Sequence, residues 1–180
     1  MAASLQYLSS KERKIIKDSW DTVRDPSKKY LQSVWLSAVR RSGRVAEIFD
    51  VSDAQREDTV VLSSSSKLQT ILQGVDQFFT HLIVELNLKE KPVADACIQL
   101  GAKHLKYHRH GIQAVYWDIF AFSMVDELEK LELFKKNWKD AYVWQKFLHF
   151  VVNNMAMGYQ KSRMDAEARA DDKKTSRDQS

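Results

Sequence analysis

Apolar residues recur every three or four positions along most of the chain, and the alternation that marks β-strands is not repeated anywhere. We expect the first helix to begin at Ser9, because Glu12 follows three positions later in a capping-box pattern. Only five glycines and two prolines interrupt the chain. The pattern predicts an all-α fold, with later helices at about residues 26–43, 59–86, 91–111, 114–130 and 137–160; Asp25 is the expected N-cap of the first of these, with Pro26 in its first turn.

A length of 180 residues suits one domain. We assign this domain to residues 9–161 and treat residues 1–8 as an N-terminal extension. Residues 162–180 are rich in charge and contain almost no large apolar side chain. Such a composition cannot bury enough apolar surface to order itself, so the sequence predicts a disordered tail there.

The composition narrows the classes of partner. The net charge is only +4, and the basic residues are mixed with acidic ones, which argues against nucleic-acid binding. Cys97 is the only cysteine, so an internal disulfide is excluded and a reducing compartment is expected. The N-terminal sequence lacks the apolar region of a signal peptide, and no apolar run approaches the roughly 18 residues of a membrane span. We therefore expect a cytoplasmic protein without a membrane span.

Three of the five histidines lie in the segment LGAKHLKYHRHG, residues 100–111. On an α-helix, His104 and His108 would share one face, a spacing that can bind zinc. No cysteine or carboxylate accompanies them in a zinc-hydrolase pattern such as H-E-x-x-H. His108 and His110, just before Gly111, are interpreted as a solvated helix end, where cationic side chains interact favourably with the helix dipole.

His104 has a different environment in the sequence. Leu100 lies one helical turn before it, Ile112 follows the glycine, and Trp117 comes up on the next predicted helix. An imidazole surrounded by large apolar groups suits two roles. It is either a buried histidine with a hydrogen-bond partner or the axial ligand of a haem.

Several motifs, in this order and spacing, resemble the globin family, and in particular nematode and neuroglobin-like globins. The resemblance covers roughly residues 9–160. Its motifs are DSW at residues 18–20, AEIF ending at Phe49, KLQTILQGVDQF, LGAKH followed by HGIQAVYWDIF, and YVWQKFLHFVVNNMAMGY.

This resemblance implies a globin fold, a three-over-three helical sandwich around one haem b (iron protoporphyrin IX). His104 matches the proximal iron ligand, and Phe49 matches the phenylalanine that packs against the haem face. The other positions expected to contact the cofactor are Trp35 on the second helix, Ile71 on the distal helix, and Leu100, Ile112 and Trp117 around the proximal histidine.

The sequence departs from the family at the distal position, where Lys67 stands in place of the expected histidine. Three interpretations remain open. Lys67 points outward to a haem propionate, or it loses its proton in a dry pocket and becomes a sixth iron ligand. Otherwise the alignment of this helix is shifted.

The resemblance implies binding of oxygen, carbon monoxide or nitric oxide at the iron, by a monomer or a homodimer. Without a distal histidine, a redox or sensing role gains weight over oxygen transport. Any enzymatic activity would then be haem redox or nitric-oxide chemistry. The alternatives are a globin-like signalling or interaction module that has lost its haem, and a zinc site at His104 and His108.

Overall fold

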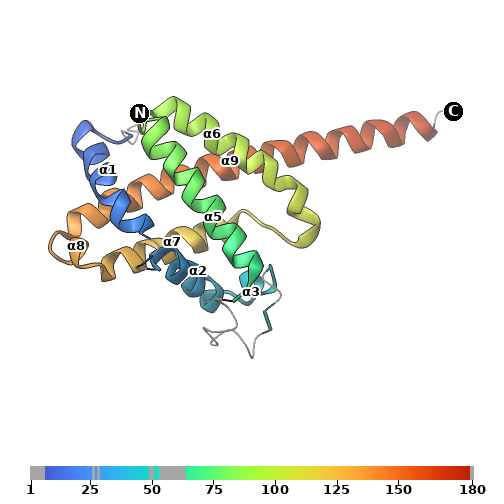
Figure 1. Cartoon of the computed structure of the whole chain (residues 1–180). Coiled ribbons are helices and arrows are strands. Elements are labelled where there is room, and N and C mark those ends of the chain that lie inside the picture. The colour runs from blue at the N-terminus through green and yellow to red at the C-terminus, as the bar shows by residue number, and fades with distance from the viewer. Residues whose placement is uncertain (1–6, 26, 28, 49–50, 53–63, 179–180) are drawn as a thin grey trace.

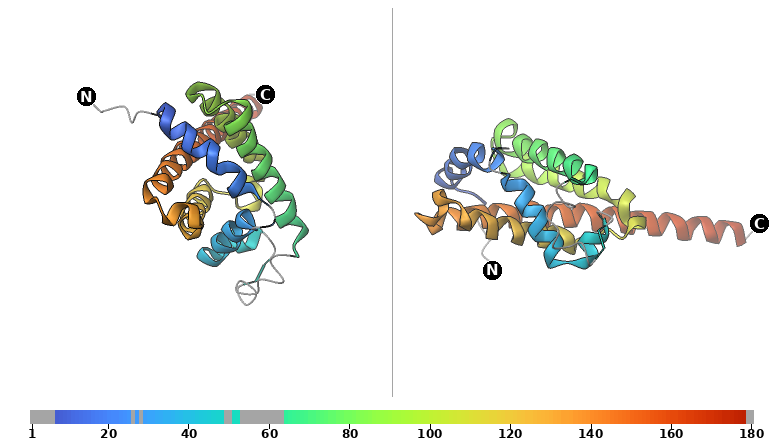
Figure 2. Two further views of the ribbon diagram at one scale, coloured as in Figure 1. Left: turned by 60° about the vertical axis from the view of Figure 1, so that its left-hand side comes forward. Right: turned by 60° about the horizontal axis from the view of Figure 1, so that its bottom comes forward.

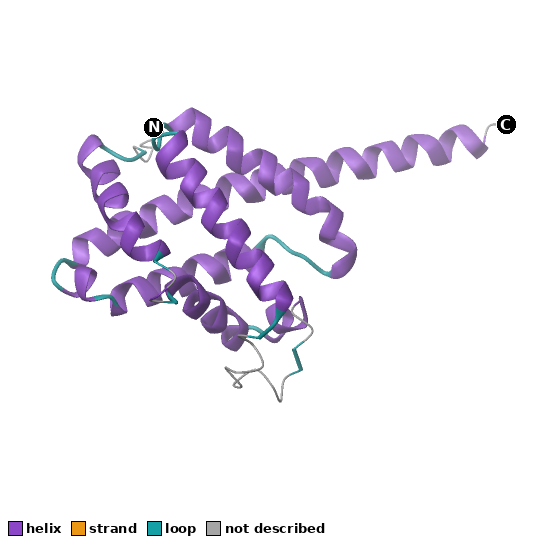
Figure 3. Ribbon diagram, viewed as in Figure 1, coloured by secondary structure: helices purple, strands orange, loops and turns teal. Residues whose placement is uncertain are grey.

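The computed structural model describes residues 7–25, 27, 29–48, 51–52 and 64–178. Within these residues all regular structure is helical, which confirms the predicted all-α class (Figure 3). The elements are α1 (Ser10–Arg24), α2 (Tyr30–Arg41), α3 (Gly43–Ile48), α5 (Ser66–Thr80), the π-helical η3 (His81–Glu85), α6 (Glu90–Lys103), the 3₁₀-helical η4 (His104–His110), α7 (Val115–Lys130), α8 (Glu132–Lys135) and α9 (Trp138–Asp178).

The first helix begins as its capping box predicts. Ser9 Oγ accepts a hydrogen bond from the Glu12 backbone N–H, and the Glu12 carboxylate accepts one from the Ser9 backbone N–H at 2.6 Å. The same carboxylate accepts a hydrogen bond from Lys146 Nζ at 3.0 Å. Because Lys146 lies on α9, the N-terminal cap of α1 is also a contact with the last helix.

Two buried tryptophans join α1 to its neighbours. Trp144 on α9 donates its Nε1–H to Ser19 Oγ at 2.9 Å, and the Trp20 and Trp144 rings lie 6.1 Å apart. Trp20 Nε1 donates to Thr80 Oγ1 on α5 at 3.3 Å. Both indole N–H groups have partners, so these rings are buried without an unsatisfied donor.

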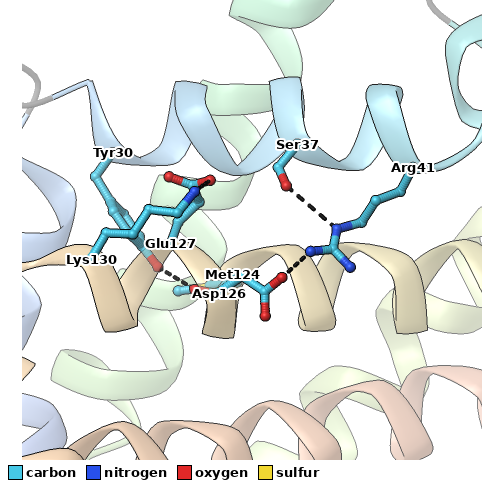
Figure 4. A network of polar contacts seen from close by, with 7 residues as sticks. All are labelled: Tyr30, Ser37, Arg41, Met124, Asp126, Glu127 and Lys130. Atoms are coloured by element: carbon cyan, nitrogen blue, oxygen red, sulfur yellow. Dashed lines mark hydrogen bonds and ion pairs between the residues drawn. The ribbon is translucent and has the colours of Figure 1, made fainter.

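Helix α2 is fastened to α7 at both of its ends (Figure 4). At its first residue, the buried Tyr30 hydroxyl donates to the Met124 carbonyl at 2.6 Å. At its last residue, Arg41 forms an ion pair with Asp126. Trp35 lies between these two contacts in α2. The contacts therefore hold α2 against α7 both before and after Trp35.

Helices α6 and α9 cross in backbone contact, as Figure 1 shows, because each has a glycine at the crossing. A Cβ atom at Gly101 would lie 1.9 Å from the Met155 carbonyl oxygen, and one at Gly158 would lie 2.0 Å from the Ile98 carbonyl oxygen. Neither position tolerates a side chain without separating the helices. The crossing holds the residues just before His104 against α9.

Helix α9 continues well past the helical body and ends as a projecting arm (Figures 1 and 2). The sequence predicts disorder for residues 162–180, whereas the structure is helical as far as Asp178. The segment has no glycine or proline, and Arg163 pairs with Glu167 one turn later at 3.4 Å. It also extends an already packed helix, so no new helix nucleus has to form.

Among the described residues, no helix combines the length and the apolar character that crossing a bilayer requires. The distal helix was predicted to start near residue 59, but residues 53–63 lie outside those described. In the structure α5 begins at Ser66, with the Ser65 hydroxyl accepting from the Leu68 backbone N–H.

Candidate functional site: an apolar cavity with one histidine

A cavity of about 820 Å³ lies between α2, α3, α5, α6, η4, α7 and α9. Its volume falls within the roughly 300–1,000 Å³ typical of sites for small molecules and cofactors. Most of its wall is apolar, and much of that wall comes from aliphatic and aromatic side chains on α5, α7 and α9 that were not among the predicted cofactor contacts: Val75, Phe78, Phe79, Tyr116, Phe120, Leu148, Val151, Val152 and Met155.

The structure brings most of the predicted site residues together around this cavity. Its lining includes Trp35 from α2, Lys67 and Ile71 from α5, Leu100 from α6, His104 from η4, and Ile112 and Trp117 from the corner and the helix that follow. Phe49 lies outside the described residues. Residues more than 80 positions apart in the sequence, such as Trp35 and Trp117, therefore line the same cavity.

His104 is oriented by its own helix. Its Nδ1 lies 2.7 Å from the Leu100 carbonyl oxygen, and because a carbonyl only accepts hydrogen bonds, Nδ1 carries the proton. In the neutral imidazole Nε2 then carries the lone pair. No described residue makes a hydrogen bond to Nε2. The ring is held edge-to-face against Trp117, with centroids 5.6 Å apart.

The 3₁₀ geometry of η4 separates His104 from His108. With about three residues per turn, Tyr107 rather than His108 follows His104 on the same face, and the His104 and Tyr107 rings lie 5.9 Å apart. The zinc hypothesis assumes an α-helix here, so its premise of a shared face is wrong. Within the described part of the chain, no group of three or more His, Cys, Asp or Glu side chains is arranged to hold a metal ion.

Tyr159 on α9 is a structural partner that the sequence analysis missed. Its side chain is buried as a whole, and its hydroxyl donates to the Ile112 carbonyl at 2.8 Å. Because its one proton is used there, the hydroxyl accepts from His108 Nδ1, which lies 2.5 Å away. Its ring packs edge-to-face on Trp117 at 5.5 Å. Burial raises the pKa of the Tyr159 phenol, although Arg163 acts in the opposite direction. His108 is exposed near the end of η4, as its interpretation as a solvated helix end expects, and it is also a hydrogen-bonded link to α9.

Lys67 lies in the first turn of α5, at the exposed edge of the cavity. Its Nζ donates to the Ile48 carbonyl of α3 at 3.4 Å. The exposed side chains of Glu47, Ser66 and Thr70 also line the cavity. The opening is therefore polar and charged, while the interior is apolar.

Three tilted aromatic rings from α2, α5 and α7 form part of the cavity wall. Trp35 lies 4.9 Å from Phe120, and Phe120 in turn lies 6.4 Å from Phe79. The spacing of Phe79 and Phe120 along their helices does not distinguish a core position from a cavity wall.

Comparison with known proteins assigns neither a family nor a function to the chain. No protein-family model matches the chain, and no curated protein is detectably similar to it. The globin resemblance therefore stays a prediction from the sequence motifs. The function is accordingly argued from the cavity and from His104.

Proposed function

We propose that the chain binds haem b in this cavity, with His104 Nε2 as the axial ligand of the iron. The observation that carries this proposal is the hydrogen bond from His104 Nδ1 to the Leu100 carbonyl. Histidines that ligate metals usually donate their other ring N–H to a carbonyl or carboxylate, which fixes the tautomer and the ring orientation. Here that arrangement occurs at the wall of a large apolar cavity.

The donor set and the walls fit a flat apolar macrocycle with carboxylates on one edge. The cavity offers one imidazole within an apolar lining, and Lys67, Ser66 and Thr70 provide donors at its opening. Ile71, Leu100, Ile112 and Trp117 would pack against the ring faces. When bound, the group would supply an iron centre that takes up oxygen, carbon monoxide or nitric oxide. The three-over-three globin arrangement is part of the same proposal.

The position of Lys67 favours a sensing or redox role over oxygen storage. Its ammonium is engaged with the Ile48 carbonyl at the opening, while other α5 residues of the lining, such as Ile71 and Val75, are apolar. A bound oxygen is stabilised by a hydrogen-bond donor aimed at its developing charge. With Lys67 held at the opening, its ammonium does not supply that donor, and the site would discriminate less between oxygen and the other diatomic ligands.

A haemin titration of the purified chain tests the proposal. The expected result is a saturable one-to-one increase in Soret absorbance, lost in His104→Ala and retained in His149→Ala, which removes an exposed imidazole from α9. A chain that takes up no haemin would contradict the proposal and favour the haem-less signalling or interaction module.

A second measurement distinguishes the roles of Lys67. The dithionite-reduced spectrum of the haem-loaded chain should be the same in Lys67→Ala as in the unmodified protein, because Lys67 is expected at the opening. A change from a six-coordinate to a five-coordinate spectrum in Lys67→Ala would instead identify lysine as the sixth ligand.

A further inference from the structure

A second hollow, of about 410 Å³, lies between α1 and the turn that precedes α6. The residues that line it are Ser10, Arg13, Lys14, Lys17, Asn87 and Lys89. We call this hollow the basic hollow, because four of its lining side chains are cations and none is a carboxylate. It shares no residue with the cavity around His104.

The positions on α1 form one face of that helix. Ser10, Arg13, Lys14 and Lys17 are spaced three and four residues apart, which places their side chains in one row. This spacing assembles three cations along the length of a single helical face. The alignment of these three cations therefore follows from their spacing along the α-helix.

The opposite wall is a turn held firmly in place. Asn87 and Leu88 adopt left-handed backbone conformations with φ of 55° and 54°. Leu88 is fully buried, and its N–H donates to the Leu82 carbonyl at 3.0 Å. Lys17 donates to the Asn87 side-chain oxygen across the gap. The turn is thus anchored in the core on one side and joined to α1 on the other.

Little negative charge offsets these cations. Lys14 pairs with Asp18 at 2.7 Å, but both side chains are largely exposed, so this pair is weak. Arg13 donates to the Leu8 carbonyl and to Ser10 Oγ, which orients its guanidinium without neutralising it. The Lys89 ammonium makes no ion pair or hydrogen bond within the described residues. Converging like charges repel one another, and an anion between them relieves that repulsion.

We propose that the basic hollow binds an anion with two or more phosphate groups. Phosphate oxygens accept hydrogen bonds from several cations at once, and the lining supplies ammonium, guanidinium, hydroxyl and amide donors. A volume of about 410 Å³ admits more than one phosphate group. Both a soluble polyphosphate, such as the triphosphate of a nucleotide, and a phosphoinositide headgroup present this chemistry. The site is independent of haem binding.

Calorimetric titration of the full chain with inorganic triphosphate tests the site. We expect saturable binding that weakens about 20-fold in the double variant Lys17→Gln, Lys89→Gln, since each exposed charge contact contributes up to about fivefold. The matched control Lys139→Gln, Lys161→Gln removes the same charge from exposed positions on α9 and should change affinity less than about twofold. An equal loss in both double variants, or no saturable binding of triphosphate and of bisphosphate vesicles, would overturn the proposal.

Vesicle sedimentation separates the two sources of phosphate. Phosphatidylcholine vesicles that contain phosphatidylinositol 4,5-bisphosphate are compared with vesicles that contain phosphatidylserine at equal total charge. If the protein co-sediments with the bisphosphate vesicles alone, and the Lys17 and Lys89 substitutions abolish this, the site is assigned to a lipid headgroup. Triphosphate binding without vesicle retention assigns it to a soluble anion. Equal retention by both vesicle types would contradict a built phosphate site, because it reflects net charge alone.

Discussion

The hydroxyl of Tyr159 lies 2.8 Å from the carbonyl oxygen of Ile112 and donates a hydrogen bond to it. This bond joins the last helix to the corner that follows η4. The hydroxyl also accepts a hydrogen bond from His108, and the Tyr159 ring supports Trp117, which contacts His104. The orientation of His104 therefore depends on α9 as well as on its own helix.

Replacing Tyr159 by phenylalanine should lower the free energy of unfolding by about 1–2 kcal/mol. The ring would remain, but the half-buried Ile112 carbonyl would lose its donor, and leaving such a group unpaired is costly; the exposed His108 can bond to water instead. Urea denaturation at neutral pH measures the change. The control is Tyr142→Phe, which removes an exposed hydroxyl on the same helix. Equal stability of the two variants would show that the hydrogen bonds contribute nothing net.

Gly101→Ala should destabilise the protein by about 3 kcal/mol, because the added methyl group would lie 1.9 Å from the Met155 carbonyl oxygen and force α6 and α9 apart. Gly74→Ala on α5 is the matched control, since nothing lies within 4 Å of its added Cβ. That substitution should stabilise the helix by up to about 1 kcal/mol. Thermal denaturation of both variants distinguishes the two effects, and equal shifts would contradict close contact of the helices.

Glu12 should make a pH-dependent contribution to stability. Partial burial raises its pKa, but hydrogen bonds from Ser9 and Lys146 outweigh this effect and hold the pKa below its ordinary value. A folded-state pKa below the unfolded one stabilises the fold above the unfolded pKa, and this stabilisation is lost as the pH falls through the folded value. Glu12→Gln should therefore cost roughly 0.5–1 kcal/mol at pH 7 and nothing at about pH 2.

Urea titrations of the unmodified chain and of Glu12→Gln at several pH values check this expectation. The difference between their free energies of unfolding should narrow as the pH falls. A difference that stays constant down to low pH would mean that the carboxylate charge plays no part. Glu132→Gln, at an exposed pair with Lys135, serves as the control.

Cys97 should resist alkylation in the folded protein. Burial raises the pKa of its thiol to about 12, so the reactive thiolate is scarce, and the side chain is fully inaccessible. Mass spectrometry after iodoacetamide treatment at pH 8 should show no adduct in the native chain and one adduct in urea. Rapid native labelling would contradict the buried position.

The all-α class and the location of most helices followed from apolar spacing, because burial of one helix face leaves a periodic record in the sequence. The neighbours of His104 were predictable for the same reason, as Leu100 precedes it by one turn. Trp35 and Lys67 were placed only through the globin resemblance. Their meeting around one cavity depends on how helices pack, and local spacing carries no information about that packing.

Other features had no local signal at all. The change from α-helix to 3₁₀-helix at His104 reverses which residue shares its face, yet a polar stretch of this kind suits either helix. Tyr159 is separated from His108 by 51 positions, so their hydrogen bond is visible only in three dimensions. The helical arm beyond residue 161 lacks an apolar face, and its order depends on the packed helix it extends.

The projecting arm and part of the cavity wall belong to the same helix, α9. The wall residues Val151 and Met155 and the Tyr159 hydroxyl belong to the same uninterrupted helix as the end at Asp178. Long helices curve only gently where nothing kinks them, so a tilt of the projecting end would reach the wall beside His104 along the helix itself, without passing through a loop. The mechanical connection between the cavity and the outside of the molecule is therefore built into a single secondary-structure element.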